Sequence, residues 1–527
     1  MTTTSKKPPI QFAATYSSDK SGIKDVFRSE PLANAIELVV DNGSQLARPS
    51  WAASVRTIFE DASVRLAQGP PGPSGRELYE SFASSINWHF AIFDDAHTFV
   101  MAFDDKRYVP ERKRVAQIQR RVALAESIAR RGVPEWTWDG TSTIVSIVDE
   151  RPLPPWERVR ANSAAYARVI DELGALLERR FAPPPGRRVI VDTGIRVSVI
   201  ETALDGTTVL MPRTLLDNEK PPIGEGDMTA LYYARRALSS AYSRIDANVH
   251  QNYARSETFD PTMLRYYTED TSETPMNLRL LPPSMRPETP VDASNVRSVY
   301  EAGAVLLRTV DTDFLPLALV CWAGLSSSSS NHNIYVGLGR VHRLNDKYCT
   351  GTTLDAVPHQ EYFDVKRIHD ELCRMHSSET RSIVTAWSFA AFCIACGNDY
   401  TRRLHNLSHR TMYSGYKRAF LEQSSASRNR RLVREFATSD TTPAIALLDV
   451  DAFVDLIRHA YYERLPKSRR PVLLPTWQEL RQIVAEAFTK NERAHMPDLA
   501  TLTAYYDQVS WSLAYASGAS YGAEHLP

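Results

Sequence analysis

The chain has few of the features that define several common protein classes. Its 527 residues include only 5 cysteines, too few for a small secreted disulfide scaffold, and no apolar signal segment opens the sequence. The longest apolar run, 314–325, is far shorter than the roughly 18–20 residues that cross a bilayer. We therefore expect an intracellular protein of the cytoplasm or nucleus, in a reducing environment and without a membrane partner.

Net charge is also lacking, since 62 Lys and Arg balance 62 Asp and Glu. A globally basic nucleic-acid coat and an acidic tail protein are therefore excluded, and any surface for nucleic acid must be local. Hydrophobic residues at 43% and charged residues at 24% are ordinary for a chain that folds around a core. The sequence contains no Walker-type loop, no HExxH motif and no Gly-x-Ser-x-Gly motif.

Strand and helix patterns alternate through the first two thirds of the chain, and the last third is helical. Strands are expected at 39–40, 98–103, 188–191 and 305–310, and helices at 110–131, 228–238, 443–465, 476–488 and 499–516. This order favours an α/β fold with a mostly parallel central sheet, helices on both faces and a helical C-terminal region.

The composition suggests three parts. Residues 1–19 have no apolar period and are predicted to form a mobile tail. Residues 20–430 are expected to form the core, with an insertion at about 242–298 that is rich in Pro, Thr, Glu and Arg. Residues 431–527 are expected to form a helical region packed on that core.

Acidic residues gather where these elements begin or end. One Asp at such a junction is usually a helix cap or a turn residue, but a parallel sheet would collect several at one edge. Asp105, which directly follows Asp104, is the less favoured alternative for one position. The candidates are Asp41, Asp104, Glu225, Asp227, Asp311, Asp313 and Asp399.

A cluster of seven carboxylates would repel strongly in a cleft unless cations compensated the charge. Hard oxygen ligands without a matching His or Cys set favour Mg²⁺ or Mn²⁺ over zinc. Two such ions can activate a water molecule and stabilise the leaving oxygen of a phosphodiester. The acids therefore indicate a two-metal hydrolase.

A basic helix supplies the second half of this hypothesis. Between Lys106 and Arg131 nine Lys and Arg oppose only two Glu, a local excess of seven in a neutral chain. One helical face carries a row of donors formed by Lys113, Gln117, Arg120 and Arg121. Alone this row would be an ordinary solvated face, but beside an acidic cluster it predicts a phosphate site.

Other candidate motifs have simpler interpretations. Cys393 and Cys396 lie in an apolar run with no second pair at zinc-site spacing, which predicts two thiols packed in the core. The pairs Tyr461-Tyr462 and Tyr505-Tyr506 are also expected in the core rather than as a platform for stacked bases.

The motifs, in order, resemble those of the XRN-type 5′→3′ exoribonucleases, which are relatives of the flap endonucleases. Residues 22–28 (GIKDVFR) are similar to the opening of that family, and 41–43 (DNG) to its first acidic motif. The pattern PxxKxxxQxxRR at 110–121 matches its arch helix. Further similarities are GEGD at 224–227, DTD at 311–313, FCIACGNDY at 392–400 and the tyrosine- and tryptophan-rich stretch at 505–518.

The resemblance implies a PIN/FEN-like nuclease core over residues 20–430, without the accessory domains of the large cellular enzymes. The seven acids would bind two Mg²⁺ or Mn²⁺ ions, and Lys113, Gln117, Arg120 and Arg121 would hold a terminal 5′-phosphate. The implied activity is hydrolysis of 5′-monophosphorylated RNA to nucleoside monophosphates. The short form would suit a virus-encoded enzyme acting in a host cell.

Two alternatives stay open. One is a flap- or structure-specific endonuclease on DNA or RNA, including single-stranded or flap DNA, because related folds share the carboxylates. The other is a catalytically inactive scaffold of the same fold that binds RNA without cutting it. The oligomeric state has no signature in the sequence.

Overall fold

The structure is a computed structural model of the whole chain. Several predicted features lie outside the residues that it describes, among them the tail at 1–19 and the insertion at 242–298. The described residues are 21–29, 31–40, 48–67, 69–70, 72–104, 111–148, 151–194, 197–210, 226–238, 303–309, 311–323, 333–338, 359–376, 382–397, 401, 404, 407–422, 431–436, 445–489 and 495–520.

A large sheet dominates the first part of the fold. Within the described residues it has nine strands in the order β1-β9-β8-β7-β2-β3-β4-β5-β6. The five central strands, from β8 to β4, are parallel, and two antiparallel strands extend each side. The strands are β1 (Ile36–Val40), β2 (Val55–Asp61), β3 (Thr98–Ala102), β4 (Arg187–Asp192), β5 (Val197–Thr202), β6 (Thr208–Leu210), β7 (Ala304–Thr309), β8 (Ile334–Leu338) and β9 (His359–Asp364).

Helices cover both faces of the sheet, as the sequence predicts for an α/β fold. Because strand side chains alternate, Phe59 of β2 and Ile58 beside it enter two different hydrophobic clusters. The first cluster is shared with α7 (Gly226–Leu238), α10 (Phe314–Ala323) and α12 (Ser382–Ala395). The second is shared with α3 (Gly75–Ile92) and α6 (Ser163–Arg180).

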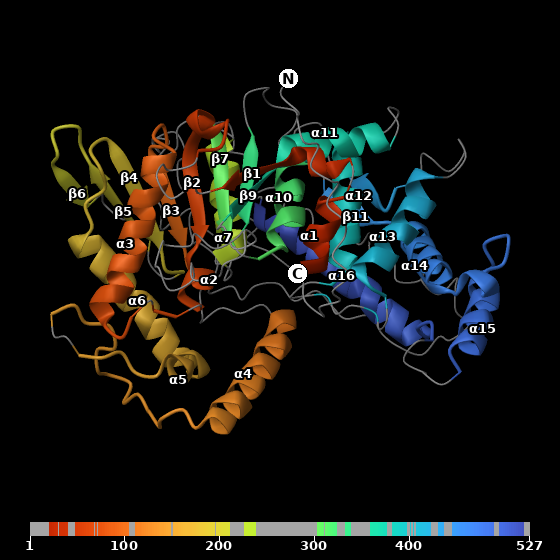
Figure 1. Cartoon of the computed structure of the whole chain (residues 1–527), viewed down its shortest axis with the longest axis horizontal. Helices are drawn as coiled ribbons and strands as arrows, with labels where there is room; N and C mark the ends of the chain where they lie inside the picture. Colours follow the sequence, from red (N-terminus) through yellow and green to blue (C-terminus); the bar gives the residue numbers. More distant parts are fainter. Residues whose placement is uncertain are drawn as a thin grey trace, which may run out of the picture.

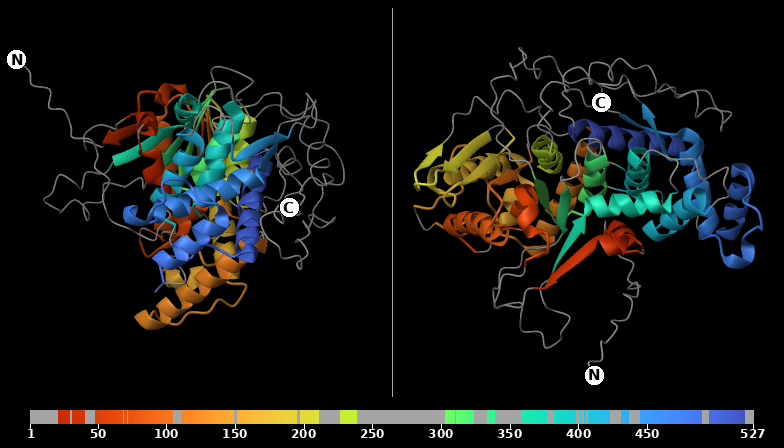
Figure 2. Two further views of the ribbon diagram at one scale, coloured as in Figure 1. Left: turned by 90° about the vertical axis from the view of Figure 1, so that its right-hand side faces the viewer. Right: turned by 90° about the horizontal axis from the view of Figure 1, so that it is seen from above.

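The C-terminal part is mainly helical and lies beside the sheet. Figure 1 shows α14 and α15 at the opposite end of the molecule from β5 and β6, and the view from above in Figure 2 agrees. The long helix α16 packs on α7, α10 and α12 and so joins this part to the sheet. The elements are α13 (His409–Tyr416), α14 (Val450–Arg464), α15 (Trp477–Ala487), α16 (Leu499–Ser520) and a two-stranded sheet of β10 (Val433–Phe436) and β11 (Ile445–Leu448).

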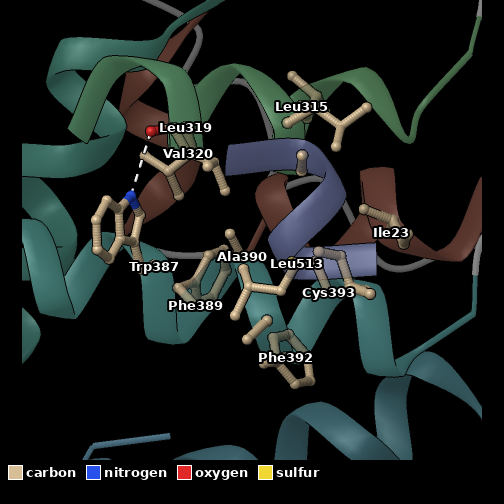
Figure 3. Packing of buried hydrophobic residues seen from close by; sticks show 14 of the residues in the cluster. Ile23, Leu315, Leu319, Val320, Trp387, Phe389, Ala390, Phe392, Cys393 and Leu513 are labelled. Carbon is tan, nitrogen blue, oxygen red and sulfur yellow. Dashed lines mark hydrogen bonds between the residues drawn. The ribbon is translucent and has the colours of Figure 1, made fainter. Parts of the chain in front are cut away.

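The core between α10, α12 and α16 is dense and apolar. Figure 3 shows side chains of α1 (Ser21–Phe27) meeting those of the three helices in one cluster. Trp387 of α12 is fully buried, and its indole Nε1 donates to the carbonyl oxygen of Val320 on α10 at 3.2 Å. The only polar atom of this large side chain is thereby satisfied.

Most predicted elements agree with the structure to within two or three residues, but the expected helix at 443–465 is wrong at its start. Residues 445–448 form β11, which pairs with β10, and the helix begins only at Val450. The carboxylate of Asp449 accepts the N–H of Ala452 at 2.9 Å and caps α14. No described helix is long and apolar enough to span a bilayer.

Candidate functional site

Asp61, the last residue of β2, lies at the centre of a group of acidic residues. Its side chain is buried, at 7% exposure, and its Oδ1 accepts the N–H groups of Ser63 at 3.1 Å and Val64 at 3.3 Å. These donors begin the short helix α2 (Ala62–Ala67) and hold the carboxylate at the end of the strand.

Three predicted acids surround Asp61. Burial raises the pKa of the Asp61 carboxyl well above its ordinary value, and the nearby charges of Asp104, Asp227 and Asp311 raise it further. The effect is electrostatic evidence that the four carboxylates share one region, because like charges act strongly only at short range. They come from four separate segments, at the ends of β2, β3 and β7 and at the start of α7.

Asp104 connects β3 to the neighbouring segments. Its backbone N–H donates to the hydroxyl of Ser63 at 2.6 Å, and its Oδ1 accepts the N–H of Gly226 at 2.9 Å. Gly226 begins α7, so the positive end of this helix faces the Asp104 carboxylate. Ser63 therefore bonds to both Asp61 and Asp104, and fixes their spacing.

Gly226 allows α7 to approach the sheet closely. A Cβ at this position would lie 3.0 Å from Oδ1 of Asp61 and 3.2 Å from both the Ala102 carbonyl oxygen and Oδ1 of Asp104. These separations are tighter than most real Cβ contacts. A side chain here would push α7, and Asp227 with it, away from the other acids.

The acids after β7 divide between two directions. The N–H of Asp311 donates to Thr309 Oγ1 at 3.0 Å, and the N–H of Asp313 donates to Asp311 Oδ1 at 3.1 Å. Asp311 acts on Asp61, whereas Asp313 is buried and helps to raise the pKa of the Cys393 thiol on α12, after burial and Cys396. Asp313 therefore also lies near the C-terminal turn of α12.

Two further buried residues border this group. Tyr166 of α6 is 7% exposed, and its pKa is raised by burial first and then by Asp104 and Asp61. At neutral pH it is a neutral hydroxyl beside the carboxylates. Asp192, at the end of β4, accepts the hydroxyl of Tyr233 at 2.8 Å.

The remaining predicted acids cannot be located. Asp41, Glu225 and Asp399, as well as the alternative Asp105, lie outside the described residues. The strand before Asp41, β1, forms one margin of the sheet, four strands from β2 or about 19 Å at the usual spacing. Asp61, which the sequence interpretation missed, occupies the central position that was expected for Asp41.

No group of three or more His, Cys, Asp or Glu side chains within the described ranges is arranged to hold a metal ion. Asp61, Asp104, Asp227 and Asp311 each accept a backbone N–H instead. The chemistry of the donors fits a hard divalent cation, since all four are carboxylates. Metal binding would require these side chains to exchange backbone donors for the ion.

The predicted phosphate-binding helix is present as α4 (Glu111–Arg131). It projects from the body beneath the end of the sheet where β2 runs into α2, and it packs on α5 (Trp156–Ala161) (Figure 1). Arg121 is exposed, whereas the side chains of Lys113, Gln117 and Arg120 lie outside the described residues.

The second half of α4 is largely exposed on all sides. Val122 is 53% exposed and Ala125 is exposed, although both belong to the apolar stripe of the helix. Ile128, at 2% exposure, is the buried anchor of this half. The helix is therefore held at its C-terminal end, and its donor face is accessible from Arg121 onward.

The remaining predictions concern core residues and are confirmed. Cys393 and Cys396 are free thiols, each 1% exposed. The tyrosine pairs at 461–462 and 505–506 are all at most 3% exposed and pack within the C-terminal part.

Comparisons with known proteins give no family. The sequence matches no protein-family model, and no curated protein is significantly similar to it. The arrangement of the residues themselves therefore carries the functional argument.

Proposed function

We propose that the chain is a metal-dependent nuclease, and specifically a 5′→3′ exoribonuclease that hydrolyses 5′-monophosphorylated RNA to nucleoside monophosphates. The observation that carries the proposal is the convergence of Asp61, Asp104, Asp227 and Asp311 from four segments of the chain. Buried like charges are costly, and proteins retain them mainly where a cation or a reaction uses them. A PIN/FEN-like architecture of the sheet is part of the same proposal.

In this proposal the four carboxylates bind two Mg²⁺ or Mn²⁺ ions, together with Asp313, Glu225 and Asp399. We assign Asp61 the role first expected of Asp41, because β2 is central in the sheet and β1 is at its margin. The ions would supply water activation and charge stabilisation at the scissile phosphodiester. Ser63 and the start of α7 would orient Asp61 and Asp104 for this task.

The preference for a 5′-phosphate rests on α4. The helix lies beyond the carboxyl ends of the central strands, as a clamp for the end of a substrate would. Arg120 and Arg121 would contact phosphate oxygens with paired guanidinium donors, and Lys113 and Gln117 would add single donors. RNA with a 5′-triphosphate or a cap should then be a poor substrate.

One assay tests both the activity and its polarity. The purified chain is incubated with Mg²⁺ and matched RNAs bearing 5′-phosphate, 5′-hydroxyl or 5′-triphosphate ends, and with a single-stranded and a flap DNA. Mononucleotides released only from the 5′-phosphate RNA support the proposal, and EDTA should stop the reaction. Internal fragments from any substrate would indicate the endonuclease alternative.

Substitutions test the site assignment. Asp61→Asn and the double variant Asp311→Ala/Asp313→Ala should each abolish cleavage. Asp205→Asn is the matched control, because Asp205 is an exposed acid that accepts the Thr207 N–H at 2.8 Å in the turn between β5 and β6. Full activity in the double variant would refute the assignment.

A second candidate is an inactive scaffold that binds RNA ends. The observation that favours it is that the carboxylates of the described residues accept backbone N–H groups and form no ready metal-binding group. Tight binding of 5′-phosphate RNA without cleavage under Mg²⁺ and Mn²⁺ would establish it.

A further inference from the structure

Asp192 lies at the same edge of the sheet as the proposed metal site. In the strand register Asp61 pairs with Ala102 and Ala102 pairs with Asp192. Residues paired in this way point to one face of a sheet, which here is the face covered by α7. Asp61 and Asp192 therefore flank the small Ala102 at a distance of two strand spacings, or about 10 Å.

Helix α7 is attached at both sides of this arrangement. At its start the N–H of Gly226 donates to Asp104, and Asp227 acts on Asp61. Seven residues later, or roughly 10 Å along the axis, the hydroxyl of Tyr233 donates to Asp192 Oδ2 at 2.8 Å.

The second attachment is fully buried and itself supported. Asp192 is 0% exposed and Tyr233 is 1% exposed. The other oxygen of Asp192 accepts the N–H of Gly194 at 2.8 Å, and Gly194 has a φ of +87°, a conformation that favours glycine. The turn after β4 therefore fixes the carboxylate, and the carboxylate accepts a bond from the helix.

We propose that Asp192 and Tyr233 are positioning residues that fix α7 along its axis and thereby set Asp227 against Asp61 and Asp104. The inference rests on the proposed function. The close fit at Gly226 leaves α7 little freedom to shift without moving Asp227. A metal site tolerates displacements of only about 0.5 Å, so the second attachment should matter for affinity.

The test is Mn²⁺ binding to the purified full chain, measured by titration calorimetry without RNA. Tyr233→Phe removes one oxygen atom and should weaken Mn²⁺ binding about tenfold, the lower range for groups that support metal ligands. Asp192→Asn should act in the same direction. Tyr506→Phe is the control, since its equally buried hydroxyl donates to Leu448 in β11 at 2.8 Å, and it should leave affinity unchanged.

The outcomes separate the two proposals. Wild-type protein that binds Mn²⁺ while Tyr233→Phe binds it equally well would overturn the positioning role and leave the nuclease proposal intact. Equal weakening in Tyr233→Phe and Tyr506→Phe would also overturn it, because a general loosening would then explain both. Wild-type protein that binds no Mn²⁺ would overturn both proposals.

Discussion

The carboxyl edge of the sheet and the C-terminal helical part bury polar groups in opposite ways. In the helical part the buried tyrosine hydroxyls donate to backbone oxygens: Tyr505 to Ala395, and Tyr506 to Leu448. Burial raises the pKa of Tyr506, so the group stays neutral. At the sheet edge Asp61 is buried beside like charges. The helical part is arranged for stability, and the sheet edge gives up stability for a concentration of charge.

The strongest way to break this comparison is Asp61→Asn. The proposal expects a loss of nuclease activity of at least about 10⁴-fold, the size seen when one member of a catalytic group is removed. Because Asn keeps the shape of Asp61 and removes one of several repelling charges, the unfolding temperature should rise in EDTA. Activity assays and thermal unfolding of the same preparation check both. A variant that is inactive and less stable would mean that Asp61 is mainly structural.

A large effect of the opposite kind is expected in the helical core. Trp387→Ala removes a fully buried indole and its bond to Val320, and should lower the free energy of unfolding by about 3–5 kcal/mol. Denaturant unfolding followed by circular dichroism measures it. The material that stays folded should retain its affinity for Mn²⁺, because the residue is not part of the carboxylate group.

The pH response provides a test of intermediate size. His376 is 3% exposed, its Nε2 lies 2.9 Å from the Tyr416 hydroxyl, and burial lowers its pKa to about 3, with a further contribution from Arg431. The unfolded chain, with an ordinary pKa near 6.5, takes up the proton first. This contribution to stability is therefore complete above about pH 6.5 and is lost as the pH falls towards 3.

At pH 5 the loss from His376 amounts to about 2 kcal/mol. Unfolding measured between pH 7 and 5 in wild type and His376→Gln separates this contribution, because Gln does not titrate. A pH dependence that is identical in both proteins would show that other groups dominate. His459, whose pKa burial lowers to about 4, acts with the same sign and is the next candidate.

Much of the fold could be predicted because its signals are local. The ends of β3, α4 and α16 follow from apolar period, turn residues and helix caps, all of which are present within a short window. Residues 445–448 were predicted as helix because their apolar run continues into α14. Pairing with β10 decides that they form a strand, and pairing is not written in the window.

The candidate site was predicted in part for the same reason. Asp104, Asp227 and Asp311 follow strand ends or begin a helix, and the structure groups them around Asp61. Asp61 was missed because Asp41, with its Asn-Gly turn, offered a clearer strand end. Which strand is central depends on long-range sheet order, and the order places β2 between β7 and β3. The apolar run at 55–59 before Glu60 and Asp61 was the available signal.

The smallest expected effects test whether the two regions differ beyond their buried charges. Each contains one helix with a reciprocal cap: Ser74 with Glu77 at the start of α3, and Thr476 with Glu479 at the start of α15. In both, the hydroxyl accepts the N–H of the Glu, and the Glu carboxylate accepts the N–H of the capping residue, at 2.9 and 2.8 Å. Ser74→Ala and Thr476→Ala should each cost about 1 kcal/mol of unfolding free energy.

Chemical denaturation of the two cap variants beside wild type measures the costs. Similar values would indicate that the helices of both regions obey the same local rules, so that the contrast between them resides in the carboxylates at the sheet edge. A cost at Ser74 several times larger than at Thr476 would instead mean that α3 supports the sheet edge. In that case the activity of Ser74→Ala should fall with its stability, whereas the activity of Thr476→Ala should not.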